Sequence, residues 1–149
     1  MENDDTEPQQ PTALRTVAFD RKDLVLADLI VAAEQGVEVG VTLYLGGTIV
    51  MGRIISGKKY LVALSDTIAS ATGGSERAIG LLQDRITSYA EAWDETASDD
   101  ENRVEYLRFI HLANARTYLG KGEFMPAEGG VPWRGPLAGI LGFSLGTIS

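Results

Sequence analysis

The sequence comprises 149 residues, of which 44% are hydrophobic and 23% are charged, and its formal net charge at pH 7 is −8. This is the composition of a globular domain rather than of a disordered chain. The sequence has no cysteine, which excludes a disulfide framework, a zinc site with thiolate ligands and a cysteine nucleophile. The acidic charge disfavours nucleic acid and anionic membranes as partners, because these are held mainly by Lys and Arg.

The N-terminal segment, residues 1–20, is polar and acidic and is predicted to be a flexible tail. Its first residues are acidic where a secretory signal peptide would be basic and then apolar. No apolar stretch reaches about 18 residues, the length that a membrane-spanning helix requires. These features predict a cytoplasmic protein that does not enter a membrane. Residues 21–149 are expected to form a single α+β domain.

The first predicted element is a helix that begins after Asp23 and ends before Gly36. A carboxylate at position 23 can accept hydrogen bonds from the first backbone N–H groups of a helix, and glycine commonly follows the last turn. Four apolar residues of this segment share one face: Leu24, Ala27, Ile30 and Val31.

A β-hairpin is predicted over residues 37–56. From Val37 to Leu45, valine and leucine occupy every second position, which is typical of a strand with one buried face. Gly46 and Gly47 are expected to form the tight turn. In the returning strand, Gly52 indicates a bend or a close approach of another backbone.

The period then changes, and residues from about 58 to 97 are predicted to form a helical insertion between the second and third strands. The first helix has Tyr60, Leu61, Leu64 and Ile68 on one face. Ser75 is expected to cap the second helix, whose apolar residues recur at intervals of three and four: Ile79, Leu82, Ile86, Tyr89 and Trp93. This row of residues either packs on the protein's own sheet or is a surface for self-association or for a partner helix.

Strand-like patterns return in the last third of the chain. We expect one strand over 104–112, another over 113–119, a Gly- and Pro-rich loop over 120–132, and short apolar segments interrupted by glycine thereafter. The whole order predicts an α+β fold with a small, strongly bent antiparallel sheet or an Sm-like open barrel of about five strands. The helical insertion departs from the Sm-like fold, in which the equivalent connection is short.

Three motifs follow one another in this last third. They are Phe109-Ile110-His111-Leu112-Ala113-Asn114, Trp133-Arg134-Gly135-Pro136-Leu137 and Gly142-Phe143-Ser144-Leu145-Gly146. They resemble the F-I-H-L-x-N, W-R-G-x-L and G-F-x-L-G segments of the gas vesicle accessory protein GvpU family. With the helix-then-strand opening upstream, the resemblance covers residues 23–149. It implies a non-enzymatic accessory factor that is distinct from the very hydrophobic shell subunit.

The resemblance, the acidic composition and the apolar surfaces predict a protein that self-associates and binds vesicle-associated proteins, thereby influencing vesicle assembly or clustering. Tryptophan and arginine are common interface anchors. We expect partner contacts at Trp133, Arg134, Phe143, Tyr89 and Trp93. A structural role for Trp133, closing one end of the barrel, stays open. An Sm-like RNA-binding oligomer is the alternative function, which the strand order suggests and the charge opposes.

No catalytic site, cofactor or metal site is predicted. His111 is the only histidine, so a metal site with paired imidazoles is excluded. It is either a half-buried structural residue or a pH-sensitive contact, because imidazole changes its charge near neutral pH. Residues 142–146 have the G-x-S-x-G spacing of a nucleophile elbow, but the histidine that such a site needs does not follow them.

Overall fold

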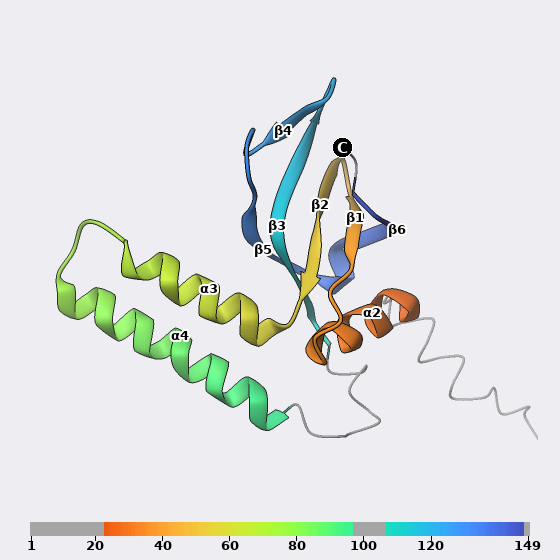
Figure 1. The fold of residues 1–149 in the computed structure, drawn as a ribbon. Helices are drawn as coiled ribbons and strands as arrows, with labels where there is room; N and C mark the ends of the chain where they lie inside the picture. Colours follow the sequence, from red (N-terminus) through yellow and green to blue (C-terminus); the bar gives the residue numbers. More distant parts are fainter. Residues whose placement is uncertain (1–22, 97–106, 148–149) are drawn as a thin grey trace, which may run out of the picture.

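The computed structural model describes residues 23–96 and 107–147 as an α+β fold. Its elements are α2 (Leu24–Glu34), β1 (Gly40–Leu45), β2 (Thr48–Ile55), α3 (Gly57–Ala69), α4 (Glu76–Thr96), β3 (Phe109–Gly120), β4 (Glu123–Met125), β5 (Val131–Pro136), the 3-10 helix η1 (Leu137–Gly139) and β6 (Ile140–Leu145). Helix α2 lies at one end of a bent antiparallel sheet, and α3 and α4 form a helical hairpin that extends away from it (Figure 1). We call this hairpin the arm. The predicted tail, residues 1–20, lies outside the described residues.

Helix α2 is defined by its two ends. The Asp23 carboxylate accepts hydrogen bonds from the backbone N–H groups of Val25 and Leu26, at 2.9 and 3.2 Å. Gly36, with a φ of 92°, follows the last turn. Both ends were therefore predicted correctly. The buried face was predicted only in part: Ala27 and Ile30 are buried as expected, whereas Leu24 is exposed and the other buried residues are Leu26 and Ala33.

Strands β1 and β2 form the predicted hairpin around Gly46 and Gly47. The first strand begins at Gly40 rather than at Val37. Within it, the alternation correctly predicts the burial of Val41 and Leu43. Thr42 is buried as well, and its hydroxyl group donates a hydrogen bond of 2.9 Å to the carbonyl oxygen of Gly146. At this point the strand is therefore buried on both faces, and the polar residue on its second face has a hydrogen-bond partner.

Strand β3 is one continuous strand with a bulge at Asn114, so the prediction of two strands there is wrong; residues 104–106 lie outside the described part. Asn114 has a φ of 52°, and the registers of β3 with β2 and with β5 both shift nearby. Two glycines make room for this bulge. A Cβ on Gly52 would lie 3.0 Å from the carbonyl oxygen of Ala113, and one on Gly130 would lie 2.3 Å from the carbonyl carbon of Asn114. The bulge thus accounts for the close backbone approach that Gly52 predicted.

The sheet has six strands, in the order β4-β3-β2-β1-β6, with β5 also paired to β3. The prediction of about five strands omitted β4, which lies in the segment that was expected to be a loop. Strands β5 and β6 lie at opposite margins of the sheet, and no pairing between them closes it within the described residues. The antiparallel α+β class is therefore confirmed, whereas the Sm-like barrel stays an interpretation.

The hydrophobic core lies between α2, the strands and η1. It comprises Leu26, Ile30 and Ala33 of α2, Val41, Leu43, Val50, Ile54, Ile110, Leu112 and Ala115 of the strands, and Leu137 of η1. None of the residues of this cluster comes from α3 or α4. The arm therefore occupies the predicted insertion without contributing to the core of the sheet.

Candidate partner-binding surfaces

One face of α4 holds the arm together. Its residues recur at intervals of three and four and are buried or half-buried against α3: Ile79, Gln83, Ile86, Ala90 and Trp93. The predicted apolar row is therefore divided between two surfaces. Its first, third and fifth residues face α3, whereas Leu82 and Tyr89 are 50% and 49% exposed. The sequence pattern was right for the helix, but it combined an internal contact with an external surface.

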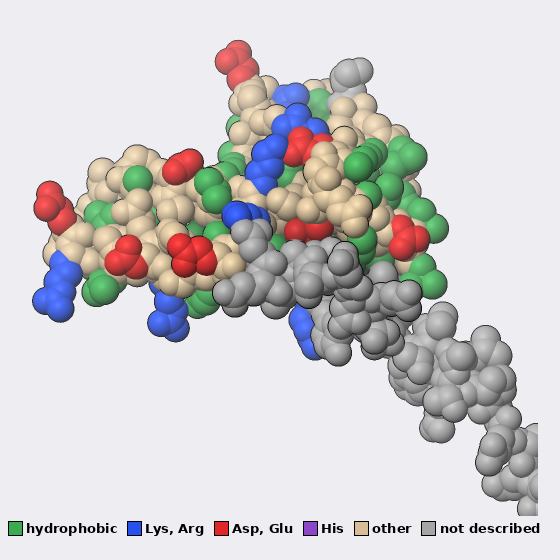
Figure 2. Space-filling view, turned by 60° about the horizontal axis from the view of Figure 1, so that its bottom comes forward, with side chains coloured by type: hydrophobic (Ala, Val, Ile, Leu, Met, Phe, Trp, Pro, Cys, Tyr) green, Lys and Arg blue, Asp and Glu red, His purple; other side chains and the backbone are tan. Residues whose placement is uncertain are grey.

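The exposed side of α4 carries a small mixed surface, which we call the α4 flank: Leu82, Arg85 and Tyr89. The Nε of Arg85 donates a hydrogen bond of 3.1 Å to the hydroxyl group of Tyr89, and the guanidinium carbon lies 5.9 Å from the centre of the ring. Along the arm, hydrophobic side chains lie among acidic and basic ones (Figure 2). An exposed tyrosine beside a leucine and an arginine is a composition typical of protein interfaces.

The base of the arm meets the sheet at five residues, which we call the arm junction: Glu34, Gly57, Tyr60, Trp93 and His111. The carboxylate of Glu34 accepts two hydrogen bonds, one from the backbone N–H of Gly57 at 2.9 Å and one from the indole N–H of Trp93 at 3.0 Å. A Cβ on Gly57 would lie 2.2 Å from Cζ2 of Trp93. Glycine at position 57 therefore allows the start of α3 to approach the indole, because any side chain there would overlap the ring.

His111 lies inside this junction and is only 2% exposed. Its ring centre is 4.9 Å from that of Tyr60 and 5.6 Å from that of Trp93, the latter in an edge-on arrangement. Burial, together with the positive charge of Arg134 opposite it in the β3–β5 ladder, lowers the pKa of His111 to about 4. The imidazole is therefore neutral at pH 7, and its titration would act on the junction. A pH-sensitive contact with a partner stays a prediction.

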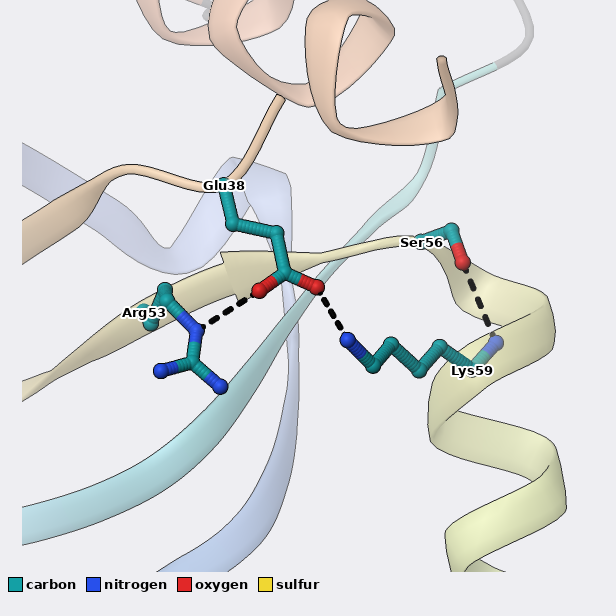
Figure 3. A network of polar contacts seen from close by, with 4 residues as sticks. All are labelled: Glu38, Arg53, Ser56 and Lys59. Atoms are coloured by element: carbon teal, nitrogen blue, oxygen red, sulfur yellow. Dashed lines mark hydrogen bonds and ion pairs between the residues drawn. The ribbon is translucent and has the colours of Figure 1, made fainter. Parts of the chain in front are cut away.

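A second set of polar contacts fixes the start of the arm. Glu38, between α2 and β1, forms ion pairs with Lys59 and with Arg53, the latter at 2.8 Å (Figure 3). The hydroxyl group of Ser56 accepts a hydrogen bond of 3.1 Å from the backbone N–H of Lys59 and so caps α3. The hydrogen bond from Lys59, with the charge of Arg53 in addition, lowers the pKa of the Glu38 carboxyl group. Strand β2 and the first turn of α3 are thereby linked through one carboxylate.

The neighbouring residues Trp133 and Arg134 have different environments. Trp133 is half-buried against the core, and a Cβ on Gly135 would lie 2.2 Å from its Cη2 atom. Arg134 is exposed, and its guanidinium carbon lies 3.9 Å from the centre of the Phe109 ring. Trp133 therefore has a clear packing role, while Arg134 and Phe109 form a cation–π pair that a partner can reach.

The remaining predicted contact, Phe143, is half-buried on β6, at the margin of the sheet opposite to β5. The five predicted partner contacts thus lie in three places, on the arm, on β5 and on β6, and His111 lies on β3. The structure brings Trp93 and His111 together, and Arg134 is next to His111 in the ladder, but it does not unite all of these residues in one site. Glu34 was missed because its two partners are 23 and 59 residues away in the sequence.

The segment with the G-x-S-x-G spacing is part of the sheet. Residues 142–145 lie in the extended strand β6, so the strand–turn–helix context of a nucleophile elbow is absent. Across residues 23–93 and 107–147, whose side chains the structure describes, no three His, Cys, Asp or Glu side chains are grouped so that they could hold a metal ion. The same part of the chain includes no helix that is both long and apolar enough to span a membrane.

The comparisons with known proteins bear on the chain as a whole. The family model described as gas vesicle protein GvpU-like matches residues 23–148. No curated protein and no solved structure matches the chain. The matched range begins at the N-cap of α2 and includes the arm, the junction and all six strands.

Proposed function

The chain belongs to the GvpU-like family of gas vesicle proteins, and from this premise we propose that it is a non-enzymatic accessory protein that self-associates and binds vesicle-associated proteins. Through these contacts it influences the assembly or clustering of gas vesicles in the cytoplasm. Its role is to join other proteins rather than to convert a substrate. Trp93 and Trp133 support these contacts from within the fold, whereas Tyr89, Arg134 and Phe143 are proposed to make them.

The arm is the structural observation that carries this proposal. Its helices pack mainly on each other, and it extends to one side of the sheet (Figure 1). The residues of the α4 flank do not belong to the hydrophobic core, so Leu82 and Tyr89 can be changed without disturbing it. A mixed surface with exposed leucine and tyrosine side chains on a protruding helix is suited to docking in a groove of another protein.

Co-flotation with buoyant gas vesicles tests the proposal. The full-length protein is mixed with isolated vesicles at physiological salt, the vesicles are floated, and the bound protein is measured. The double variant Leu82→Ser/Tyr89→Ser is expected to bind at least about tenfold more weakly, which is the scale of losing two interface side chains. Val62→Ser is the matched control, because Val62 is 48% exposed on the other helix of the arm.

Two results would contradict the proposal. If the wild-type protein stays in solution while the vesicles float, the protein does not bind them. If the double variant and the Val62→Ser control bind equally well, the α4 flank is not the contact. Arg134→Ala then tests the second exposed site, and it preserves the buried Trp133, whose removal would damage packing.

A further inference from the structure

The two margins of the sheet differ in their capacity to pair with another strand. Among the described residues, strand β6 is paired only with β1 and forms one margin, whereas β5 and the short β4 form the other, beside β3. An unpaired edge strand presents free backbone N–H and C=O groups, and natural proteins commonly protect such edges with proline, charge or short strands. A comparison of the two margins therefore indicates which one is available.

The β5 margin is protected. The N–H of Leu137 donates to the carbonyl oxygen of Arg108 at 2.8 Å, which fixes the backbone direction of this ladder. The direction of the backbone N–H and C=O groups alternates along a strand. The backbone groups of residues 133 and 135 therefore also point to β3, whereas those of Pro132, Arg134 and Pro136 point outward. Two of these three outward positions lack an N–H group, and the third carries a charged side chain. A second strand would find only one donor there.

The β6 margin has no such protection. The N–H of Gly146 donates to the carbonyl oxygen of Gly40 at 2.7 Å. By the alternation along the strand, the backbone groups of Ser144 also point to β1, whereas those of Phe143 and Leu145 point outward. Residues 140–145 include neither proline nor a charged side chain. Leu145 is 65% exposed although it is paired with the buried Val41, so its side chain lies at the open border of the core face.

We propose that β6 is a homotypic interface, at which a second copy of this chain adds its own β6 in antiparallel orientation. A second copy is the favoured occupant because an antiparallel strand pair is self-complementary under a two-fold axis. Each chain carries a net charge of −8, and an uncharged segment such as this one lets two copies meet without placing like charges in direct contact. Figure 2 shows hydrophobic side chains gathered on the side opposite the arm, where Figure 1 places β6 and α2.

Of the registers that the outward groups permit, we propose the one in which residues 143 and 145 pair with each other. Phe143 and Leu145 of one copy exchange backbone hydrogen bonds with Leu145 and Phe143 of the other, which places the two-fold axis at Ser144. The phenyl ring of each copy then covers the exposed Leu145 of the other. Ser144 faces its symmetry mate as a non-hydrogen-bonded pair, in which the two Cα atoms are about 4.5 Å apart. This separation is within the range of a disulfide bond.

Cysteine cross-linking tests this register directly, because the chain has no cysteine of its own. The full-length Ser144→Cys variant is oxidised at micromolar concentration and analysed by non-reducing gel. Ser70→Cys, at an exposed position on the arm, is the control for random collisions. We expect Ser144→Cys to form disulfide-linked dimers at least about tenfold faster, because pairing raises the local concentration of the two thiols. Equal rates for the two variants would overturn the proposal.

A second pair of variants tests the surface without a cross-link. Leu145→Lys introduces a charge at the β6 margin, and Leu119→Lys makes the same change at a leucine of β3 that is 58% exposed. Analytical ultracentrifugation measures the self-association of both variants. Leu145→Lys should weaken it by about tenfold or more, while the control should not. Equal self-association in both variants, with folding verified by circular dichroism, would also overturn the proposal.

This inference rests on the self-association in the proposed function, but the two can fail separately. Cross-linking of Ser144→Cys together with no binding to vesicles would refute the vesicle role and support the β6 interface. Vesicle binding by a wild-type protein that is strictly monomeric would refute the interface and leave the vesicle contact intact. If β6 instead pairs with a strand of another protein, the pure chain will sediment as a monomer, and this result would refute the homotypic interface.

Discussion

The carboxylate of Glu34, in the last turn of α2, accepts a hydrogen bond of 3.0 Å from the indole N–H of Trp93, in the last turns of α4. This contact joins the helix that covers the core to the base of the arm. The other carboxylate oxygen binds the backbone N–H of Gly57, at the start of α3. One side chain therefore sets the position of both arm helices relative to the sheet.

We predict that Glu34→Gln destabilises the arm junction. An amide has one acceptor oxygen where the carboxylate has two, so either Gly57 or Trp93 would face an NH2 group instead of an acceptor. The expected loss is about 1–3 kcal/mol in the free energy of unfolding. Urea denaturation followed by tryptophan fluorescence measures it. The exposed Glu91, changed to Gln, serves as the control and should alter stability by less than about 0.5 kcal/mol; equal effects of the two changes would count against the junction.

Two Gly→Ala substitutions in the arm are predicted to have opposite signs. Gly57→Ala places a methyl group 2.2 Å from the indole of Trp93 and should cost about 1–3 kcal/mol. Gly80→Ala, on α4, meets nothing within 4 Å and should stabilise by about 0.5–1 kcal/mol through helix propensity. Thermal unfolding of both variants decides the matter. A stabilised Gly57→Ala variant would mean that Trp93 is not held against residue 57.

His111 is predicted to make stability depend on pH. Its folded-state pKa is lowered to about 4, whereas the unfolded chain has a pKa of about 6.5. Between these values the unfolded state binds more protons, so stability is complete above pH 6.5 and decreases as the pH falls towards 4. This residue alone should account for a loss of roughly 3 kcal/mol between pH 7 and pH 4.

The difference between the wild type and His111→Gln isolates this contribution, because carboxyl groups titrate in both proteins. Chemical denaturation at several pH values provides the two curves. The wild-type curve should be the steeper of the two between pH 6.5 and 4. Parallel curves would show that the imidazole is protonated as easily in the folded state as in the unfolded chain.

The bulge in β3 is predicted to require glycine at position 130. Gly130→Ala places a methyl group 2.3 Å from the backbone of Asn114, which cannot move as a flexible side chain would. We expect a loss of about 3 kcal/mol or more in the free energy of unfolding. Gly46→Ala, at the β1–β2 turn, has open space around its Cβ and should stay within about 1 kcal/mol of the wild type. Similar stabilities for both variants would show that the backbones do not approach one another as described.

Local chemistry made several features predictable from the sequence. The side chain of Asp23 can cap only the N–H groups that follow it within one turn, and Gly36 can end a helix without any distant partner, so both were placed correctly. The same holds for the cap at Ser75, which accepts a hydrogen bond of 3.2 Å from the N–H of Ala78. The glycine in the middle of β2 correctly indicated a close backbone approach, although not which strand approached.

Periodicity was less informative where two surfaces share one helix. The row from Ile79 to Trp93 has the spacing of a single seam, but only its first, third and fifth residues face α3. Leu82 and Tyr89 lie about one-sixth of a turn from that line, and hydrophobicity alone does not distinguish a residue inside a contact from one beside it. Likewise, Trp133 and Arg134 are adjacent in sequence but alternate in direction along a strand, so one is packed and the other exposed.

The sequence by itself determined the helices, the first hairpin, the α+β class and the family, because caps, turns and motifs are formed by residues within a few positions of one another. Only the tertiary structure decided that Glu34, Gly57, Trp93 and His111 meet, and that within the described residues β6 is an open margin while prolines protect β5. These relationships join residues that are distant in the chain. They depend on strand order and register, which no local pattern specifies.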